Sequence, residues 1–546
     1  MQLKNHLKQN YLIIAVVFYG LFLALIRLKG SLQGDEAIYA QVAKETLAKG
    51  NWLEFYWRGE IWLEKPPLYL WLVMLVKKYI TQEEAGLRMI NGFFLTAAML
   101  AAYFFTQKIS NQKITAFLSA VIIGSIPIFI KHSRAVMTDA ALTFFILGAL
   151  YFGFLAENKH KKHLIHFWIF CALGILVKNF LGFYAVIIYL IYLIALKKLK
   201  LIISGYSLIG FLIFLLITLP WHVIMYLKFD KIFLNQYFLY HFLERSEYSI
   251  IHSPWDEVPL AYLKILFSHY GVWSVILAAL LIYLLLFYQK LIKHFRESEK
   301  RGLILALIWF FTVFISFSLA KTKSPHYILP LVPSMALTIS IIINGLIKSR
   351  PRDIIIFCGL ALLNFTPFYY LNASDFGESN ILFPAVFLKF SKIFGLAGYA
   401  VLYWGLGLFF LLLIGLYKLI EKNKAGFEYL VLFMVVLNLL VPFYPERGAA
   451  EKKLAEAVNQ KFNQKPLNIY LDDPKLITNT LLYYLPLGSD VERYQRNQVE
   501  FLSDIDLSKH KDYCLVSSKV DQRVFIPCLA KESLEPPGWQ CNYCLD

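Results

Sequence analysis

Charged residues are scarce in this chain. They make up 17% of the 546 residues, whereas 58% are hydrophobic, and the mean hydropathy is +0.56. Soluble domains carry about 25% charged and about 45–50% apolar residues. This composition excludes a large soluble globular protein. It is typical of a membrane protein, because the apolar residues gather in long uncharged runs.

Acidic residues are also fewer than basic ones. The chain has 37 Asp and Glu against 54 Lys and Arg, a formal net charge of +17. A basic surplus can signal nucleic-acid binding. In a membrane protein, however, Lys and Arg collect in cytoplasmic loops because they resist translocation. We attribute the surplus to topology and expect no nucleic-acid partner.

The N-terminal segment lacks the small-residue cleavage site of a removable signal peptide. Basic residues at Lys4 and Lys8 precede an apolar run from Tyr11 to Ile26. We therefore expect an uncleaved signal anchor as the first membrane span.

Apolar runs of about 20 residues predict membrane-spanning helices. Hydropathy gives about thirteen of them, at 11–28, 88–106, 113–131, 138–156, 163–178, 180–196, 201–220, 269–288, 303–320, 326–347, 353–371, 394–417 and 427–443. The segment 66–80 is apolar but short and begins with Pro66 and Pro67. We interpret it as a juxtamembrane or re-entrant helix. The predicted fold class is an α-helical polytopic membrane protein.

The basic loops fix the orientation. When 66–80 is not counted as a membrane span, the loops richest in Lys and Arg all face the cytoplasm, as the positive-inside rule requires. These loops are 107–113, 157–162, 197–200, 289–301, 348–352 and 418–424. The same topology places the loops 29–87 and 221–268 on the external side. Residues 1–443 then form a transmembrane domain, with a short external turn at 321–326.

The tail from 444 to 546 differs in composition, being rich in Lys, Asn and Asp. Probable strands at 467–471 and 513–517 and a helix at 474–485 predict a small soluble α/β domain on the external side. It holds four of the six cysteines, namely Cys514, Cys528, Cys541 and Cys544. An external compartment permits disulfides, and four cysteines allow three pairings. Disulfides are favoured over half a zinc site at Cys541 and Cys544.

Basic residues beside external span ends are what the positive-inside rule disfavours, so each requires a reason. The chain has them at Arg58, Lys65, Lys131, Arg134, Lys178, Arg245, Lys321 and Lys323. A single one could extend its charge to the lipid headgroups. As a set at one interface they favour a shared anionic ligand, since Lys and Arg are the usual phosphate binders.

Carboxylates accompany these cations. Asp35 and Glu36 open an amphipathic stretch with helical spacing, where Asp35 is either a helix N-cap or a functional acid. Asp139 stands at the external start of an otherwise uncharged span, which makes it a functional candidate. Glu64 immediately precedes Lys65. Acids beside cations suit group transfer, with one acid orienting or deprotonating an acceptor while the cations hold a leaving phosphate.

These motifs resemble those of the aminoarabinose (lipid A) transferases, which belong with the protein O-mannosyltransferases to the GT-C glycosyltransferases. The resemblance runs from about residue 34 to 330, and it rests on Gly34-Asp35-Glu36 with Tyr39, Glu64-Lys65-Pro66-Pro67, Met137-Thr138-Asp139 and the segment 320–330 around Lys321, Lys323 and Tyr327. The small external tail matches the aminoarabinose transferases better than the protein O-mannosyltransferases. The resemblance implies an inverting transferase with a periplasmic active site in a bacterial inner membrane. Donor and acceptor would be an undecaprenyl-phosphate sugar and lipid A.

The resemblance also implies residue roles. Asp35 and Asp139, with Glu36, would be the catalytic or acceptor-orienting acids. The lipid phosphate would be held by Lys65, Lys178, Arg245 and Tyr327, together with Arg58 and Tyr39. Glu64 and a histidine of the 221–268 loop, His241 or in its place His222 or His252, would hold a divalent metal such as zinc.

One departure from the family pattern concerns position 38. Many members carry an arginine three residues after the first Asp, where this chain has Ile38. One positive contact to the substrate is therefore either missing or supplied by Arg58 or Arg134. This leaves the identity of the sugar and of the acceptor open. A protein or glycan hydroxyl acceptor is one alternative. A lipid or ion transporter is another, disfavoured because the polar residues lie at span ends and there is no internal repeat. The oligomeric state stays open.

Overall fold

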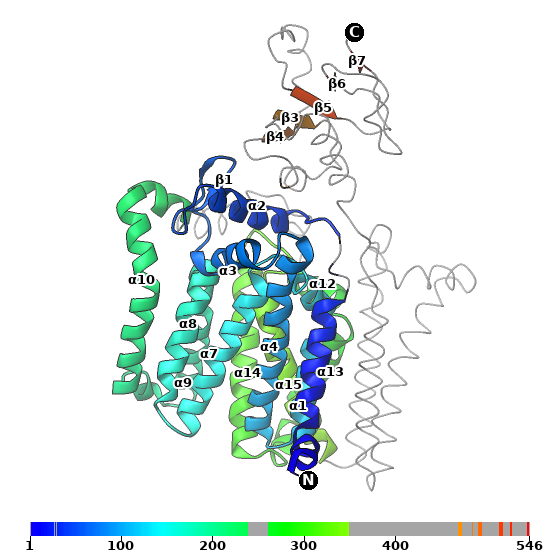
Figure 1. Cartoon of the computed structure of the whole chain (residues 1–546). Coiled ribbons are helices and arrows are strands. Elements are labelled where there is room, and N and C mark those ends of the chain that lie inside the picture. The colour runs from blue at the N-terminus through cyan, green and yellow to red at the C-terminus, as the bar shows by residue number, and fades with distance from the viewer. Residues whose placement is uncertain are drawn as a thin grey trace, which may run out of the picture.

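The computed structural model describes residues 2–26, 28, 30–237 and 260–348, together with Tyr483 and short strands between 468 and 544. Long helices stand side by side in a bundle, and short helices lie across one end of it (Figure 1). The predicted spans at 353–371, 394–417 and 427–443 lie outside the described residues. Seven stretches of the described chain are long and apolar enough to cross a membrane. The protein is a helical, multi-pass membrane protein.

Each of the ten predicted spans before residue 348 overlaps a helix of the bundle, with bounds that differ from the predicted ones. The helices are α1 (Gln2–Leu25), α4 (Glu84–Ser110), α5 (Lys113–Ile123), α7 (Asp139–Asn158), α8 (His163–Lys178), α9 (Tyr184–Ala195), α10 (Gly205–Leu234), α13 (Val272–Ile292), α14 (Glu297–Leu319) and α15 (Val332–Ile347). Apolar runs of this length form helices in a membrane because a helix satisfies its own backbone hydrogen bonds.

The prediction of one span over 113–131 is wrong in detail. Helix α5 ends at Ile123, and a separate helix α6 (Pro127–His132) follows. Gly124 is the C-cap of α5, and Pro127 begins α6 at its first turn. Proline lacks the N–H that a continuing helix would need, and its ring clashes with the preceding turn. The break turns α6 toward the end of the bundle where the short helices lie.

Helices α8 and α9 are antiparallel, as predicted, although 163–195 is one continuous apolar stretch. Asn179 has φ 49°, and the 3-10 helix η1 (Asn179–Phe183) makes the reversal. Gly182 packs directly against α8: a Cβ on it would lie 2.3 Å from the backbone N of Ile175. Only glycine permits this approach, and the tight reversal fixes Lys178 at the end of α8.

The layer across the bundle end contains α2 (Asp35–Ala48), a hairpin of β1 (Tyr56–Trp57) and β2 (Glu60–Ile61), and α3 (Pro67–Tyr79). Helices α2 and α3 pack on each other and lie across the tops of the long helices (Figure 1). The helix predicted from Glu36 is confirmed. So is the juxtamembrane helix at 66–80, which starts with Pro66 as N-cap and Pro67 in its first turn. A short helix α12 (Ala261–His269) precedes α13.

Four of the loops predicted to be cytoplasmic meet, at their described residues, at the opposite end of the bundle. Glu157, at the end of α7, pairs with Lys198 beyond α9 and, at 2.8 Å, with Arg301 of α14. Lys348, after α15, pairs with Glu299 of α14 at 3.1 Å. These ion pairs join four of the basic loops at one end, as the predicted topology requires.

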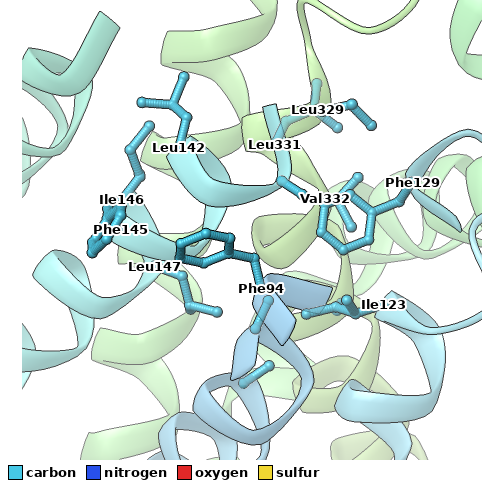
Figure 2. Packing of buried hydrophobic residues seen from close by; sticks show 14 of the residues in the cluster. Phe94, Ile123, Phe129, Leu142, Phe145, Ile146, Leu147, Leu329, Leu331 and Val332 are labelled. Atoms are coloured by element: carbon cyan, nitrogen blue, oxygen red, sulfur yellow. The ribbon is translucent and has the colours of Figure 1, made fainter. Parts of the chain in front are cut away.

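An apolar core lies where α4, α6, α7 and the start of α15 meet (Figure 2). Phe94 of α4 packs edge-to-face against Phe145 of α7, with ring centroids 5.7 Å apart. Phe129 of α6 and Val332 of α15 are fully buried beside them. Close packing of this kind holds helix ends in fixed positions. It therefore fixes the start of α7, with Asp139, and the segment before α15, with Tyr327.

The tail contains a three-stranded parallel sheet in the order β4-β3-β5, made of β3 (Asn468–Leu471), β4 (Asp490–Arg493) and β5 (Tyr513–Val516). Strands β6 (Phe525–Ile526) and β7 (Tyr543–Cys544) form a second pair. Strands β3 and β5 fall on the predicted strands. The helix predicted at 474–485 is described only at Tyr483. The domain boundary and the cysteine pairing lie outside the described residues and stay predictions.

Candidate active site

Four sequence-predicted site residues sit at element ends in the same end layer. Asp35 is the first residue of α2, Asp139 the first of α7 and Lys178 the last of α8. Tyr327 lies between α14 and the 3-10 helix η4 (Leu329–Leu331). The N-cap of α2 is Gly34, with φ 51°, and not Asp35. The Asp35 side chain is exposed and makes no capping hydrogen bond.

Asp139 and Lys178 form the central ion pair. The Asp139 Oδ1 accepts a hydrogen bond from the Lys178 Nζ at 2.7 Å, and Asp139 is only 2% exposed. The Asp139 Oδ2 is buried and has no hydrogen-bond partner within the described residues. The Lys178 ammonium lies 5.8 Å from the centre of the Tyr327 ring. A buried carboxylate oxygen without a partner is costly, so it marks a place where a ligand can bind.

Three of the predicted acids lie near the buried side chain of Tyr39. Burial raises the pKa of Tyr39 well above its ordinary value, and the carboxylates of Asp35, Asp139 and Glu64 raise it further. Three acids from three separate segments therefore lie within electrostatic range of one side chain. The Tyr39 ring packs edge-on against Tyr69, with centroids 5.8 Å apart. The structure thus brings the predicted acids together around Tyr39.

Glu64 and Lys65 join the same region. The Lys65 Nζ lies 3.7 Å from the Glu64 Oε2, and the Asn179 side chain donates to the Glu64 backbone oxygen at 3.2 Å. This bond ties the Glu64–Lys65 segment to the residue that follows Lys178. The predicted site residues of two separate segments, Glu64 with Lys65 and Lys178, therefore lie close together.

The predicted metal site is not assembled by the residues in view. The Glu64 carboxylate faces the Lys65 ammonium, and no three His, Cys, Asp or Glu side chains within the described ranges gather as a metal would need. His241, with Arg245, lies outside the described residues. The metal stays a prediction.

Glu36 has a different environment from Asp35. Its Oε1 accepts hydrogen bonds from the Arg88 Nε at 2.7 Å and from the Val136 backbone at 3.1 Å. Its Oε2 accepts from the Arg88 Nη2 at 3.0 Å and from the Gln33 backbone at 3.2 Å. Both oxygens are engaged and the side chain is buried. This geometry favours a positioning role for Glu36 over direct contact with a substrate.

Arg88 was included in the predicted span 88–106 and not singled out. Besides Glu36, its guanidinium donates to the backbone oxygens of Leu28, Gly30 and Ser31 at 2.7–2.9 Å. A charged residue at the start of an apolar run is costly to bury, and that cost was the available signal. Arg88 fixes the segment that leads into α2 and Asp35.

Asn91 lies one turn after Arg88 on α4 and is fully buried. Its side-chain amide donates to the backbone oxygens of Met137, at 2.6 Å, and of Ala135. These bonds hold the loop that leads into Asp139. One turn of α4 therefore holds both acid-bearing segments, Asp35 through Arg88 and Asp139 through Asn91.

Two histidines to which the sequence analysis assigns no role, His132 and the His326 of the 320–330 motif, complete the region. The rings of His132, at the end of α6, and His326 lie 4.9 Å apart. The His326 ring is also 4.7 Å from the Tyr327 ring. Burial lowers the pKa of both imidazoles, and the neighbouring His326 lowers that of His132 further. Both rings are therefore neutral at neutral pH.

Arg58 stands on the β1–β2 hairpin with φ 53°. Its backbone N–H donates to the buried Glu45 carboxylate at 3.1 Å, and its guanidinium lies 5.0 Å from the centre of the Trp57 ring. Glu45 also accepts from the Gly59 backbone at 2.9 Å. Glu45 thus fixes the hairpin turn that carries Arg58 over α2.

Comparison with known proteins supports the resemblance that the motifs indicate. Residues 9–238 match the family described as dolichyl-phosphate-mannose-protein mannosyltransferase. An uncharacterized protein of Aquifex aeolicus is 29% identical over 365 residues, which cover 65% of this chain and 69% of that one. An undecaprenyl phosphate-α-4-amino-4-deoxy-L-arabinose arabinosyl transferase of Pseudomonas fluorescens is 26% identical and one of Erwinia tasmaniensis 24%. The matches span 58% and 59% of the length of those two transferases and 59% and 61% of this chain.

Solved structures show the same fold. The crystal structure of ArnT from Cupriavidus metallidurans bound to undecaprenyl phosphate has a TM-score of 0.64 at 17% identity, covering 94% of this chain and 93% of that one. The apo structure of the same protein has a TM-score of 0.61 at 18% identity and 93% coverage of both chains. The described chain therefore has the ArnT fold, and over residues 9–238 it is similar to the protein mannosyltransferase (PMT) family of GT-C glycosyltransferases.

Proposed function

We propose that this protein transfers an aminoarabinose-like sugar from an undecaprenyl-phosphate donor to lipid A. The observation that carries the proposal is the group formed by Asp139, Lys178 and Tyr327, which joins a buried acid, a cation and a phenol at one bundle end. The relatives named as undecaprenyl phosphate-aminoarabinose transferases and the ArnT structure with bound undecaprenyl phosphate support the donor and the sugar.

The donor phosphate is the ligand that Lys178 suits. Lys178 is 14% exposed and held in place by Asp139, so its remaining N–H donors can meet an anion at the layer surface. Lys65, Arg245, Arg58 and Tyr39 would contribute further contacts to the headgroup.

Aromatic side chains cluster next to Tyr327. Phe317 of α14 lies 6.2 Å from Tyr327 and stacks on Tyr184 of α9 at 5.6 Å. Tyr262 of α12 is 6.4 Å from Phe317. Such flat apolar surfaces suit a polyprenyl chain. Beyond them, Leu319 at the end of α14 is 80% exposed, as expected of a side chain that faces lipid.

The reaction would be a direct displacement with inversion at the anomeric carbon. The acceptor oxygen forms the new bond as the bond from the sugar to the donor phosphate breaks, and the polyprenyl phosphate leaves. Lys178 neutralises the charge that develops on this phosphate, so it leaves without being protonated. The free Oδ2 of Asp139 and the exposed carboxylate of Asp35 would orient the acceptor and the sugar.

A protein hydroxyl is the second candidate acceptor, supported by the match of residues 9–238 to the protein mannosyltransferase family. Either acceptor would be met on the external side. The basic loops around Glu157 and Glu299 lie at the end opposite to Asp139, so by the positive-inside rule Asp139, and the tail with it, would face the external side, which we propose is the periplasm of a bacterial inner membrane.

The test uses the full-length protein in proteoliposomes with undecaprenyl-phosphate aminoarabinose and lipid A, and mass spectrometry detects the modified acceptor. A Ser/Thr-containing peptide in a parallel reaction tests the second acceptor. We expect product from wild type and a loss of about 10²–10³-fold in rate for Lys178→Met and for Asp139→Asn.

Lys198→Met is the matched control. It removes a lysine from a similar pair, with Glu157, at the other end of α7. Its rate should stay within about twofold of wild type. Failure of wild type to modify either acceptor, or equal rates for Lys178→Met and Lys198→Met, would overturn the proposal.

A further inference from the structure

We propose that the protein binds the headgroup of an anionic phospholipid between Lys108 and Lys159, at the end of the bundle opposite to Asp139. The ligand would be a phosphodiester lipid, such as phosphatidylglycerol, of the leaflet that the basic loops face. The inference goes beyond the proposed sugar transfer and does not depend on it.

Lys108 and Lys159 lie at the same end of two neighbouring helices. Lys108 is in the last turn of α4, and Lys159 is the C-cap of α7. The two helices pack on each other through Phe105, whose ring lies 5.3 Å from that of Tyr151. Asp139 begins α7, which has 20 residues and is therefore about 30 Å long. A headgroup bound at Lys159 is thus separate from the candidate active site.

The side chains of Lys108 and Lys159 converge. Lys108 is half-buried and Lys159 is exposed, and their ammonium groups lie within hydrogen-bonding reach of each other. An ammonium has three donors and no acceptor, so two charged ammonium groups cannot hydrogen-bond to each other. A lysine at a helix C-terminus is favourable by itself, and each side chain could extend separately into water. Their convergence is favourable when an anion with several acceptor oxygens, such as a phosphate, lies between them.

No acid among the described residues forms an ion pair with Lys108 or Lys159. The acid nearest to Lys159 in the sequence is Glu157, whose Oε1 accepts hydrogen bonds from Lys198 and, at 2.8 Å, from Arg301. The Glu157 side chain is fully buried and already shared by these two cations. The positive charge at Lys108 and Lys159 is therefore available to a ligand.

The start of α8 places aromatic rings beside this charge. His163 lies within electrostatic range of Lys159 and Lys162. The Phe152 ring of α7 stacks on His166 at 4.8 Å and on His163 at 6.1 Å. Imidazole rings have an apolar body and a polar edge, which suits the boundary between acyl chains and headgroups. The stack therefore indicates that Lys159 lies at the level of the headgroups.

Partly exposed aromatic side chains precede both lysines on their helices. Phe104 lies four residues, about one turn, before Lys108 and is 41% exposed. Phe152 lies seven residues, about two turns, before Lys159 and is half-buried. A phospholipid has the same order, with charge at the surface and hydrocarbon one to two turns deeper. A free phosphate would contact the lysines alone, so we assign the ligand to a lipid.

The test measures the lipid that the purified full-length protein retains in an uncharged detergent, by native mass spectrometry. Phosphatidylglycerol or phosphatidylcholine is titrated in, and the Kd of the first bound lipid is determined. We expect wild type to bind phosphatidylglycerol more tightly than phosphatidylcholine. Each lysine near an anionic lipid contributes about fivefold in affinity. Lys108→Gln combined with Lys159→Gln should therefore weaken phosphatidylglycerol binding about 25-fold.

Lys197→Gln combined with Lys200→Gln is the matched control. Both lysines are exposed, in the segment between α9 and α10 at the same end of the bundle. This variant removes the same charge, and its Kd for phosphatidylglycerol should stay within about twofold of wild type. Lys108→Arg combined with Lys159→Arg should keep the tight binding, because arginine also binds phosphate. That result would exclude misfolding as the cause of the loss in the glutamine variant.

Three outcomes would overturn the inference. Equal weakening in the two glutamine variants would mean that the basic loops attract anionic lipid diffusely. Equal affinity of wild type for the two lipids would show that the headgroup charge is not recognised. Glycerol phosphate carries the charge without acyl chains, so its displacement of phosphatidylglycerol at equal concentration would assign the site to a free phosphate and not to a lipid.

Discussion

The Arg88 Nε lies 2.7 Å from the Glu36 Oε1, in a buried pair that joins residues 52 positions apart. Through this pair α4 fixes the residue next to Asp35, and through Val136 the same carboxylate reaches the loop before Asp139. Glu36 therefore sets the distance between two acids that it does not itself contact through a hydrogen bond.

Glu36→Gln should reduce both stability and turnover. The substitution keeps the shape of the side chain but leaves the buried Arg88 charge unpaired, which costs about 3–5 kcal/mol. Arg88 keeps its three backbone acceptors, so the lower end of that range is expected. We expect a lower thermal midpoint and about a tenfold lower kcat per bound undecaprenyl phosphate, with donor KM nearly unchanged.

Glu299→Gln is the control for this prediction. Glu299 is equally buried and accepts from the Asn344 side chain at 2.6 Å and from Lys348 at 3.1 Å, at the opposite end of the bundle. It should lose stability but keep the kcat of each folded molecule. Equal kcat losses in the two variants would show that Glu36 acts on folding alone.

Gly182→Ala tests whether the α8–η1 reversal positions Lys178. The new Cβ would lie 2.3 Å from the Ile175 backbone N and 2.5 Å from the Gly174 carbonyl carbon, so backbone has to move. Overpacking costs about 1–3 kcal/mol, and here it should also displace Lys178 from Asp139. A thermal melt and the transfer assay measure the two effects, and both the thermal midpoint and the transfer rate should fall.

Gly205→Ala provides the comparison, because a Cβ at Gly205 meets nothing within 4 Å. Gly205 is the first residue of α10, where Ala changes stability by less than about 1 kcal/mol. If Gly182→Ala behaves like Gly205→Ala, the close packing of η1 on α8 does not hold Lys178 in place.

The sequence was sufficient for features that depend on local pattern. Apolar runs predicted ten helices of the described bundle, and the prolines at 66 and 67 separated α3 from the spans. Asp139 stood out because an acid at a span end is costly, and the external cations Lys65 and Lys178 stood out because the positive-inside rule disfavours them.

Long-range pairing could not be predicted in the same way. Nothing local in the sequence links Arg88 to Glu36 or His132 to His326, since each pair depends on how distant segments pack. The sequence therefore predicts Glu36 only as one of the catalytic or acceptor-orienting acids, whereas its four hydrogen bonds favour positioning. The break at Gly124 had a local signal in Pro127, but the continuous hydropathy of 113–131 outweighed it.

Tyr483 binds two lysines of the end layer. Its hydroxyl accepts from the Lys77 Nζ at 3.0 Å, and its backbone oxygen accepts from the Lys44 Nζ at 2.9 Å. Burial lowers the pKa of each lysine from 10.5 to about 8, and for Lys77 the neighbouring Lys44 adds to the lowering. The contact therefore joins the tail to α2 and α3, and it disfavours the charged forms of Lys44 and Lys77.

The stability of this contact should rise with pH. Below about pH 8 the lysines are protonated in both the folded and the unfolded chain, and above about pH 10.5 in neither. Between these values the unfolded chain binds more protons, so the free energy of unfolding increases, by up to about 3 kcal/mol for Lys77. Thermal melts from pH 7.5 to 10 should show a rising midpoint in wild type and a flatter curve in Lys77→Met. The neighbouring Lys78 is exposed, so Lys78→Met should follow wild type. A wild-type slope retained in Lys77→Met would mean that the lysine is charged when Tyr483 binds it, and the tail would then be held by an ordinary ammonium hydrogen bond.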